Sequence, residues 1–380
     1  MHVPMHDYQA EYRTLKAEID GAVQRVLERG RPDWGPEGPA FEEELGRLAG
    51  LRHMVGANSG MAALKIALLA LGIGPGDEVI TVPNSDIAST SAIHHVGAKA
   101  VWVDIEADTF NMDPALVEAA ITPRTKALLP VHLYGHPADM PALAEIAQRH
   151  NLLMVEDACL ALGATVNGQP LGTWSQAVAY SHAPSKQLGA LGTAGSVGTN
   201  DPAVAERLQL FAGYGQRRQR SYLVERWRDP GLDLLVEGVN ERLDEVQAAI
   251  LRAKLPHVPA WIEKRRADAH AYTAAFRGTA VTPPVERPGC RHTYRNYVVR
   301  VPQRDEVLRR LAHAGVSSAI LYAPPLHVQP VYAHLGYRRG SFPVSEATCD
   351  DLLCLPIGPF LSEGERAYVI ETLLAITHAL

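Results

Sequence analysis

The chain alternates short apolar runs with helical stretches between residues 55 and 200, and this pattern constrains its fold more than any other feature. Four of the runs are typical of buried strands, namely residues 78–82 (EVITV), 100–104 (AVWVD), 126–131 (KALLPV) and 152–156 (LLMVE). Helices are expected to begin between them, because Asp113 followed by Pro114, and later Asp139, are typical N-terminal caps. Strands alternating with helices predict an α/β fold whose mostly parallel sheet lies between helices.

The pattern changes after about residue 250. A long helix is predicted over residues 256–277, followed by a proline-rich segment, a strand at 297–301 and a helix at 305–314. A capping box from Ser362 to Glu365 begins the last helix. We therefore expect a large domain over residues 1–250, whose first ~30 residues form an arm or a helix, and a smaller α+β domain over residues 251–380.

The charge balance argues against a nucleic-acid partner. The formal net charge is −6, so the chain has no basic surplus with which to neutralise phosphates. One arginine cluster stands out, formed by Arg217, Arg218, Arg220, Arg226 and Arg228. This cluster forms either a solvated face or a local anion site.

Neither a membrane nor a secretory route is expected. No apolar run reaches the ~18 residues that a membrane span needs, and the first residues lack a signal-peptide core. The four cysteines form no CxxC pair and are too few for a disulfide framework. The expected location is the reducing cytoplasm.

Several conspicuous motifs are interpreted as structural. The glycine-rich segment 72–77 lies between a helix and a strand, which is the wrong order for a dinucleotide-binding loop. His94 and His95 are adjacent on a predicted helix and point apart, so we expect no metal site. Cys159 has no nucleophile signature around it and is expected to pack in the core.

Three features indicate chemistry rather than packing. Asp157 follows a predicted strand, and the carboxyl ends of parallel strands are where such sheets bind ligands. Residues 58–62 open an apolar helix with small side chains, whose free amides can hold a phosphate. Lys186 ends a loop of small residues, 181–186. A lysine for a Schiff base, a carboxylate for a pyridinium nitrogen and a helix end for a phosphate suggest a pyridoxal phosphate site.

At these residues the sequence resembles the DegT/DnrJ/EryC1/StrS family, the pyridoxal-phosphate-dependent sugar aminotransferases of the aspartate aminotransferase fold (fold type I). The similarity extends over nearly the whole chain. It is carried by residues 35–50, 76–90, 97–140, 156–164 (EDACLALGA), 181–195 (SHAPSKQLGALGTAG), 238–251 (GVNERLDEVQAAIL) and 322–332 (YAPPLHVQPVY). It implies that the large domain binds the cofactor.

The resemblance implies a role for each matching residue of the cofactor site. Lys186 corresponds to the lysine that forms the internal aldimine and moves protons, and Asp157 to the aspartate that keeps the pyridine nitrogen protonated. The phosphate would be bound by one side chain and a group of helix amides, those of Ser181, Gly60, Met61 and Ala62.

Three further positions match residues that reach the site from elsewhere. Asn240 matches an asparagine that contacts the phosphate from the partner subunit, which implies a homodimer with shared active sites. Tyr322 and His327 lie in the loop that usually approaches the sugar. Apart from the partner subunit, the implied partners are two small molecules, an amino donor and a keto-sugar acceptor.

The chain departs from the family's pattern around the cofactor. Met61 stands where the family usually has Thr or Ser, Asp86 where an aromatic ring stacks on the cofactor, and Leu160 where a glutamine bonds its 3-oxygen. The family's GDGG or GDAG motif reads GTAG at residues 192–195. Asp86 either faces the ring, as an acid or base opposite Lys186, or points away and caps the helix that follows it.

Three functions stay open at this point. The first is an aminotransferase that moves an amino group from an amino acid, with L-glutamate as the expected donor, to a keto carbon of a nucleotide-linked deoxysugar. The second is a pyridoxal phosphate enzyme of altered reaction or substrate, such as a dehydratase, an epimerase or a transaminase of a cyclitol or other ketone. Lys186 argues against a dehydratase, because those of the family place histidine there. The third is a non-catalytic homologue that acts as a binding partner.

Overall fold

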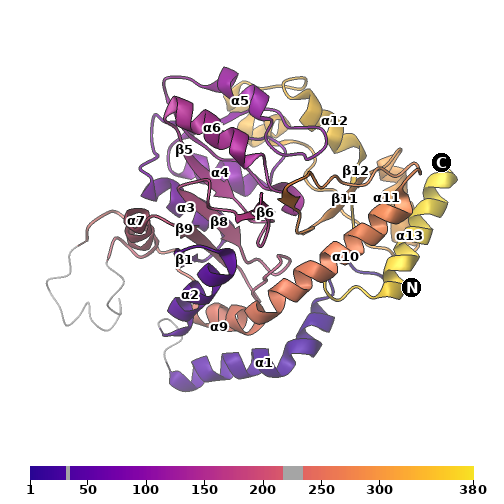
Figure 1. Cartoon of the computed structure of the whole chain (residues 1–380), viewed down its shortest axis with the longest axis horizontal. Coiled ribbons are helices and arrows are strands. Elements are labelled where there is room, and N and C mark those ends of the chain that lie inside the picture. Colours follow the sequence, from indigo (N-terminus) through magenta and orange to yellow (C-terminus); the bar gives the residue numbers. More distant parts are fainter. Residues whose placement is uncertain (31–34, 217–233) are drawn as a thin grey trace.

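The computed structural model describes residues 1–30, 35–216 and 234–380, with a seven-stranded sheet at its centre (Figure 1). The strands of this sheet are β1 (His53–Ala57), β2 (Glu78–Thr81), β3 (Lys99–Trp102), β4 (Thr125–Leu128), β5 (Leu153–Asp157), β8 (Ala177–Ser181) and β9 (Gly195–Thr199). Their order is β1-β9-β8-β5-β4-β2-β3. Neighbours pair in parallel from β8 to β3, whereas β9 pairs antiparallel with both β8 and β1. The predicted mostly parallel sheet is therefore confirmed.

Helices surround this sheet (Figure 1). In the first two thirds of the described chain they are α1 (Tyr8–Arg29), α2 (Glu37–Ala49), α3 (Gly60–Ala70), α4 (Ile87–His95), α5 (Pro114–Ala120), the 3-10 helix η1 (Leu133–Gly135), α6 (Met140–His150), α7 (Pro202–Ala212) and α9 (Glu245–Lys254). The central helix α3 packs against β8 and β9 and against α4. This arrangement places the start of α3 beside the end of β8.

Local sequence signals explain where these elements begin and end. The side chain of Asp113 accepts a hydrogen bond from the Ala115 amide at the start of α5, and that of Asp139 caps α6 in the same way. The strand predicted over residues 126–131 ends earlier, at Leu128, because Pro130 has no amide hydrogen to continue the ladder. The helix caps were thus predicted correctly from the sequence, whereas the observed ends of the strands differ from the predicted ends by a few residues.

The C-terminal third adds a second set of helices, a two-stranded sheet and one strand of a small three-stranded sheet. The helices are η2 (Leu255–His257), α10 (Val258–Phe276), α11 (Arg304–His313), η3 (Leu326–Val328), η4 (Pro330–Leu335), α12 (Pro343–Asp351) and α13 (Glu363–His378). One sheet pairs β11 (Tyr297–Arg300) with β12 (Leu352–Leu355), and the other joins β10 (Cys290–Arg291), β6 (Thr165–Val166) and β7 (Gln169–Pro170). The expected capping box of Ser362 and Glu365 begins α13.

The N-terminal residues lie against C-terminal elements. Val3 is fully buried in an apolar cluster with Tyr272, Tyr297 and Leu353, and it forms a parallel bridge with Val316. Figure 1 accordingly shows both chain ends on the side of the molecule where α13 lies. The division of the chain near residue 250 into two domains stays a prediction.

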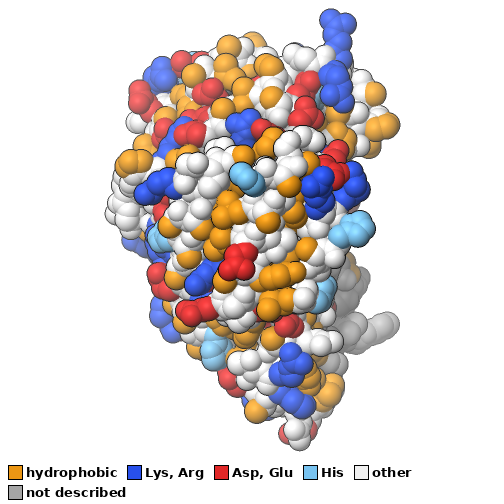
Figure 2. All heavy atoms as spheres, turned by 90° about the vertical axis from the view of Figure 1, so that its right-hand side faces the viewer, with side chains coloured by type: hydrophobic (Ala, Val, Ile, Leu, Met, Phe, Trp, Pro, Cys, Tyr) orange, Lys and Arg blue, Asp and Glu red, His pale blue; other side chains and the backbone are white. Residues whose placement is uncertain are grey.

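The described residues show a surface of mixed charge (Figure 2) and no helix suited to a membrane. On the face drawn in Figure 2, basic and acidic side chains are intermixed around apolar ones. Within residues 1–30, 35–216 and 234–380, no helix is both long and apolar enough to cross a membrane.

Candidate active site

Two predicted site residues end neighbouring parallel strands. Asp157 is the last residue of β5 and Ser181 the last residue of β8, and the two strands pair in parallel with Asp157 opposite Ala179. Asp157 is therefore part of strand β5. The sequence had predicted that it would follow the strand. The carboxyl ends of parallel strands form one edge of a sheet, so both side chains lie at the ligand-binding edge.

Asp157 is held by hydrogen bonds to both of its carboxylate oxygens. Its side chain is almost fully buried, with 4% of its surface exposed. Ser89 Oγ donates to Oδ2 at 2.7 Å, and the Cys159 amide donates to Oδ1 at 3.1 Å. Ser89, in the first turn of α4, is a site residue that nothing in the sequence pattern singled out.

The start of α3 lies against Ser181 and leaves room for nothing larger than glycine. A Cβ added to Gly60 would lie 2.7 Å from Ser181 Cβ and 2.8 Å from Cys159 Sγ. Ser59 caps the helix by accepting a hydrogen bond from the Ala62 amide at 3.1 Å, so that amide is already engaged. The helix start, with its unpaired amides and the Ser181 hydroxyl, is suited to an anion such as a phosphate.

Lys186 lies in the loop between β8 and β9, half-buried beside these groups. Burial lowers the pKa of its ammonium group, and the Arg295 guanidinium lowers it further. Cys159, Asp157 and Asp86 oppose this shift, which places all of them within electrostatic range of the lysine. A lysine whose pKa is lowered has more of its amine in the neutral, nucleophilic form.

Asp86 caps α4, which is one of the two interpretations of this residue. It precedes the helix, it is exposed, and its Oδ1 accepts a hydrogen bond from the Ala88 amide at 2.9 Å. The carboxylate nevertheless lies close enough to Lys186 and Tyr322 to raise the pKa of each. Asp86 thus combines a capping hydrogen bond with an electrostatic contribution to the site.

The two candidate residues of the loop that follows residue 320, Tyr322 and His327, lie in different surroundings. Tyr322 is half-buried near Arg295, Asp157 and Asp86, and burial raises the pKa of its hydroxyl. His327 is buried, and its Nε2 lies 2.8 Å from Glu346 Oε1. Its ring meets that of Phe342 edge-on, 4.9 Å between centroids. The structure brings Tyr322 near Asp157 and Asp86 and packs His327 in an aromatic cluster.

The remaining candidates are spread around the site. Leu160 is buried, and its carbonyl oxygen accepts a hydrogen bond from Gln187 Nε2 at 2.6 Å. Gln187, next to the lysine, is a second residue that the sequence analysis missed. Met61 is half-buried in the first turn of α3, and Asn240 is exposed. The cluster at Arg217, Arg218, Arg220, Arg226 and Arg228 lies outside the described residues.

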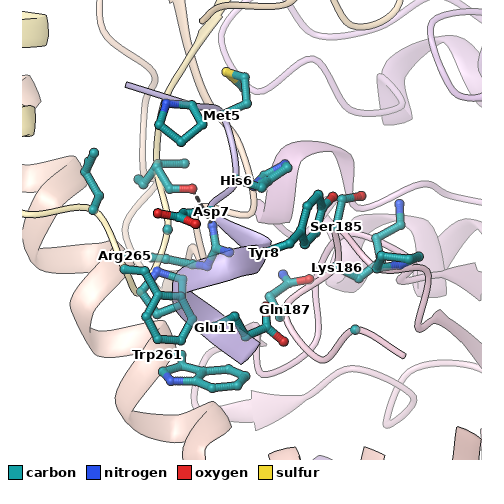
Figure 3. A pocket seen from close by; sticks show the side chains of 18 of the residues that line it. Met5, His6, Asp7, Tyr8, Glu11, Ser185, Lys186, Gln187, Trp261 and Arg265 are labelled. Carbon is teal, nitrogen blue, oxygen red and sulfur yellow. Dashed lines mark hydrogen bonds between the residues drawn. The ribbon is translucent and has the colours of Figure 1, made fainter. Parts of the chain in front are cut away.

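The N-terminal segment forms a further wall beside the lysine. In Figure 3, Met5 to Tyr8 run between Trp261 and Arg265 of α10 and the loop that carries Ser185 to Gln187, and all of these residues line one pocket. Nothing in the sequence pattern pointed to this contact, because the two segments lie about 180 residues apart in the chain.

These residues fit pyridoxal phosphate. A buried carboxylate with fixed orientation, a lysine with a lowered pKa and a glycine-walled helix start beside a serine match the three parts of this cofactor. Among the described residues, no group of three or more His, Cys, Asp or Glu side chains could hold a metal ion.

Comparison with known proteins gives a consistent answer. A model of the DegT/DnrJ/EryC1/StrS aminotransferase family matches residues 13–374. The erythromycin biosynthesis sensory transduction protein EryC1 of Saccharopolyspora erythraea is 46% identical over 99% of this chain and 100% of its own length. The dTDP-3-amino-3,4,6-trideoxy-alpha-D-glucose transaminase of Streptomyces venezuelae is 44% identical over 97% of this chain and 94% of its own length.

A solved structure confirms the expected fold. The crystal structure of DesV from S. venezuelae, in complex with a ketimine intermediate, superposes on this chain with a TM-score of 0.93. The two share 42% sequence identity, and the match covers 100% of this chain and 99% of that chain.

Proposed function

This chain belongs to the DegT/DnrJ/EryC1/StrS aminotransferase family, whose cofactor is pyridoxal phosphate, and from this premise we propose that it aminates a nucleotide-linked deoxysugar. The amino group would come from an amino acid, with L-glutamate as the proposed donor, and reach a keto carbon of the sugar. The observation that supports this most directly is the proximity of Lys186 to Asp157 and to Cys159, whose sulfur lies against the start of α3 at Gly60. The relative named a dTDP-amino-sugar transaminase supports the class of acceptor.

Each of these residues is assigned a distinct task. When bound, the cofactor supplies an aldehyde that condenses with amines and a ring that accepts electrons. Ser181 and the amides of Gly60 and Met61 would bind its phosphate, and Asp157 would accept a hydrogen bond from its protonated ring nitrogen. Ser89 and the Cys159 amide keep that carboxylate in position, because they donate to its two oxygens.

Lys186 is the proposed proton carrier. Its neutral Nζ would remove the proton from Cα of the amino donor in the first half-reaction, and its ammonium form would deliver a proton to the newly aminated sugar carbon in the second. Burial favours this neutral form, because it lowers the pKa of the amine. Tyr322 and Asp86 lie on the same site and are proposed to face the sugar, whereas His327 would support the loop through Glu346.

A homodimer completes the proposal. Asn240 is exposed in the single chain and would contact the phosphate bound by the partner subunit. A location in the cytoplasm is proposed because all four cysteines are unpaired, as in a reducing compartment.

Spectroscopy of the half-reaction tests this function. Adding L-glutamate to the holoenzyme should replace the visible absorbance of the lysine-bound cofactor with that of the amine form, and should release 2-oxoglutarate. Lys186→Ala should abolish both changes, lowering turnover by roughly 10²–10⁴-fold or more. The exposed Lys126→Ala serves as the matched control and should behave like the wild type. No conversion with glutamate or any other amino acid would contradict the proposal.

A second candidate function is a regulatory binding role. It is favoured by the name of the Saccharopolyspora relative, which describes a sensory transduction protein. Under this alternative, the protein would bind the cofactor or a sugar nucleotide without turnover. The same half-reaction separates the two candidates, since a non-catalytic homologue leaves glutamate unchanged.

A further inference from the structure

Arg295 is a buried arginine whose charge is not balanced by the side chains around it. Only 4% of its surface is exposed. Its Nη2 lies 3.2 Å from His6 Nε2, but its Nε and Nη1 are buried and have no hydrogen-bond partner among the described residues. A buried, charged donor without an acceptor is costly, so such an arginine is expected to meet an anion when the protein works.

The groups that face Arg295 are cationic or neutral on most sides. Lys186 lies within electrostatic range, and Arg265 donates a hydrogen bond to the Arg295 carbonyl oxygen at 3.4 Å. The Tyr322 and Tyr8 phenols and the Cys354 thiol also lie within electrostatic range. Burial lowers the pKa of the Arg295 guanidinium to about 10, and it remains charged at neutral pH.

His6 fixes the orientation of this guanidinium. Burial lowers the pKa of His6 to about 3, with Arg295, Arg265 and Lys186 adding to the shift. The imidazole is therefore neutral at neutral pH, and its Nε2 can accept the hydrogen bond from Arg295. Figure 3 shows that the N-terminal segment brings His6 to the same pocket as Lys186.

We propose that Arg295 binds a carboxylate of the amino donor and that His6 positions Arg295 for this task. This inference rests on the proposed function, because it assigns a residue to one of the two substrates. The reacting Cα of the donor must come within reach of Lys186 Nζ, and its α-carboxylate is one bond away from that carbon. The diphosphate of a sugar nucleotide is separated from the reacting carbon by the sugar ring, so it fits an arginine near the lysine less well. Charge-assisted hydrogen bonds from Nε and Nη1 would hold the carboxylate.

Steady-state and half-reaction kinetics of Arg295 variants test the proposal. Arg295→Met should raise the KM for L-glutamate about tenfold to a hundredfold and leave the KM for the sugar nucleotide within about twofold. Arg295→Lys should recover part of the loss, since it keeps the charge. The matched control is Arg300→Met, since Arg300 lies five residues further along and its Nε is paired with Asp351 at 2.8 Å.

Two readouts do not depend on turnover. Succinate, an unreactive dicarboxylate, should bind the wild-type holoenzyme in a calorimetric titration and should not bind Arg295→Met. The thermal unfolding midpoint of Arg295→Met should equal or exceed that of the wild type, because a buried charge with unpaired donors is removed. His6→Ala should raise the KM for glutamate less than Arg295→Met does, and His6→Gln, which keeps an acceptor, should recover it.

The outcomes are distinguishable. An unchanged KM for glutamate in Arg295→Met, equal losses for both substrates, or a loss confined to the sugar nucleotide would each overturn the proposal. A marked fall in the unfolding midpoint of both Arg295 variants would assign the residue a structural role instead. A wild-type enzyme that converts no amino acid at all would contradict the proposed function and, with it, the assignment of Arg295 to the amino donor, whereas loss of succinate binding in Arg295→Met would still identify a carboxylate site.

Discussion

Gly60 controls how closely the start of α3 approaches β8. The space that a Cβ would need is taken by Ser181 and Cys159. A bound phosphate requires both the helix amides and the serine hydroxyl within hydrogen-bond distance at once. Because Gly60 has no Cβ, the helix start can approach Ser181 closely enough for both to contact one phosphate group.

Gly60→Ala should weaken cofactor binding. The added Cβ must push Ser181 or Cys159 aside, since both would lie closer than 3 Å to it. We expect the affinity of the apoenzyme for pyridoxal phosphate to fall about tenfold or more, measured by titration with tryptophan fluorescence. Gly364→Ala is the control, because nothing lies within 4 Å of a Cβ at that helical position. Equal affinities of the two variants would show that the close contact has no role.

At the scale of elements, α4 connects stability with the site. Asp86 caps its first turn, and Ser89 in the same turn donates to Asp157. Ser85 Oγ and Ser89 Oγ form a hydrogen bond of 2.8 Å. The segment before the helix is therefore connected, through Ser89, to Asp157. A change at the cap should therefore alter the position of Asp157, the carboxylate proposed to contact the cofactor ring.

Substitutions at Asp86 should separate capping from electrostatics. Asp86→Ala removes the acceptor for the Ala88 amide and should lower the free energy of unfolding by about 1 kcal/mol, whereas Asp86→Asn should stay within about 0.5 kcal/mol. Urea denaturation measures both. Equal stability of the two variants would rule out the cap as a stabilising contact. Reduced turnover of Asp86→Asn at unchanged stability would locate the role of the carboxylate in the reaction.

At the scale of the whole molecule, buried neutral histidines couple stability to pH. His182 is fully buried beneath the lysine loop, with Nε2 2.9 Å from Ser196 Oγ. Burial lowers its pKa from the ordinary 6.5 to about 4. Between these values the unfolded chain binds a proton that the folded chain does not. The free energy of unfolding therefore falls as the pH falls from 6.5 towards 4.

The predicted acid sensitivity is measurable. His182 alone should contribute a loss of roughly 3 kcal/mol across that window, which is complete below the folded pKa and absent above 6.5. His182→Asn should flatten the pH dependence of the free energy of unfolding, even if it lowers stability overall. His313→Asn, at an exposed position, should leave the slope unchanged. A slope that His182→Asn does not alter would contradict the assignment.

The proposed homodimer predicts complementation between two inactive variants. Lys186→Ala removes the lysine, and Asn240→Asp places a negative charge next to the partner's phosphate, which should cost about tenfold or more in cofactor binding. Because the two residues would serve one site from different subunits, co-expressed variants form heterodimers with one intact site. At a cofactor concentration too low to fill the Asn240→Asp site, activity should therefore return in the mixture and be absent from either variant alone. Inactive heterodimers would place both residues in a single subunit's site.

The amino-acid sequence alone determined the parallel sheet and most helix starts, and it marked Lys186 and Asp157 as candidate chemistry-bearing residues. These depend on local signals: apolar periodicity, capping residues and a carboxylate or lysine next to a strand end. The sequence left the two interpretations of Asp86 open, and it put Tyr322 and His327 in the same loop without separating them. It gave no sign of Ser89, Gln187, His6 or Arg295.

Only the tertiary structure decided those points, because each depends on contacts between segments far apart in the chain. Arg295 and His6 are separated by 289 positions and meet only when the N-terminal segment crosses to the C-terminal elements. Side chains such as these look like ordinary surface residues in a one-dimensional pattern. Their burial, their unpaired donors and their distance to the lysine arise from packing, and packing is set by the whole fold.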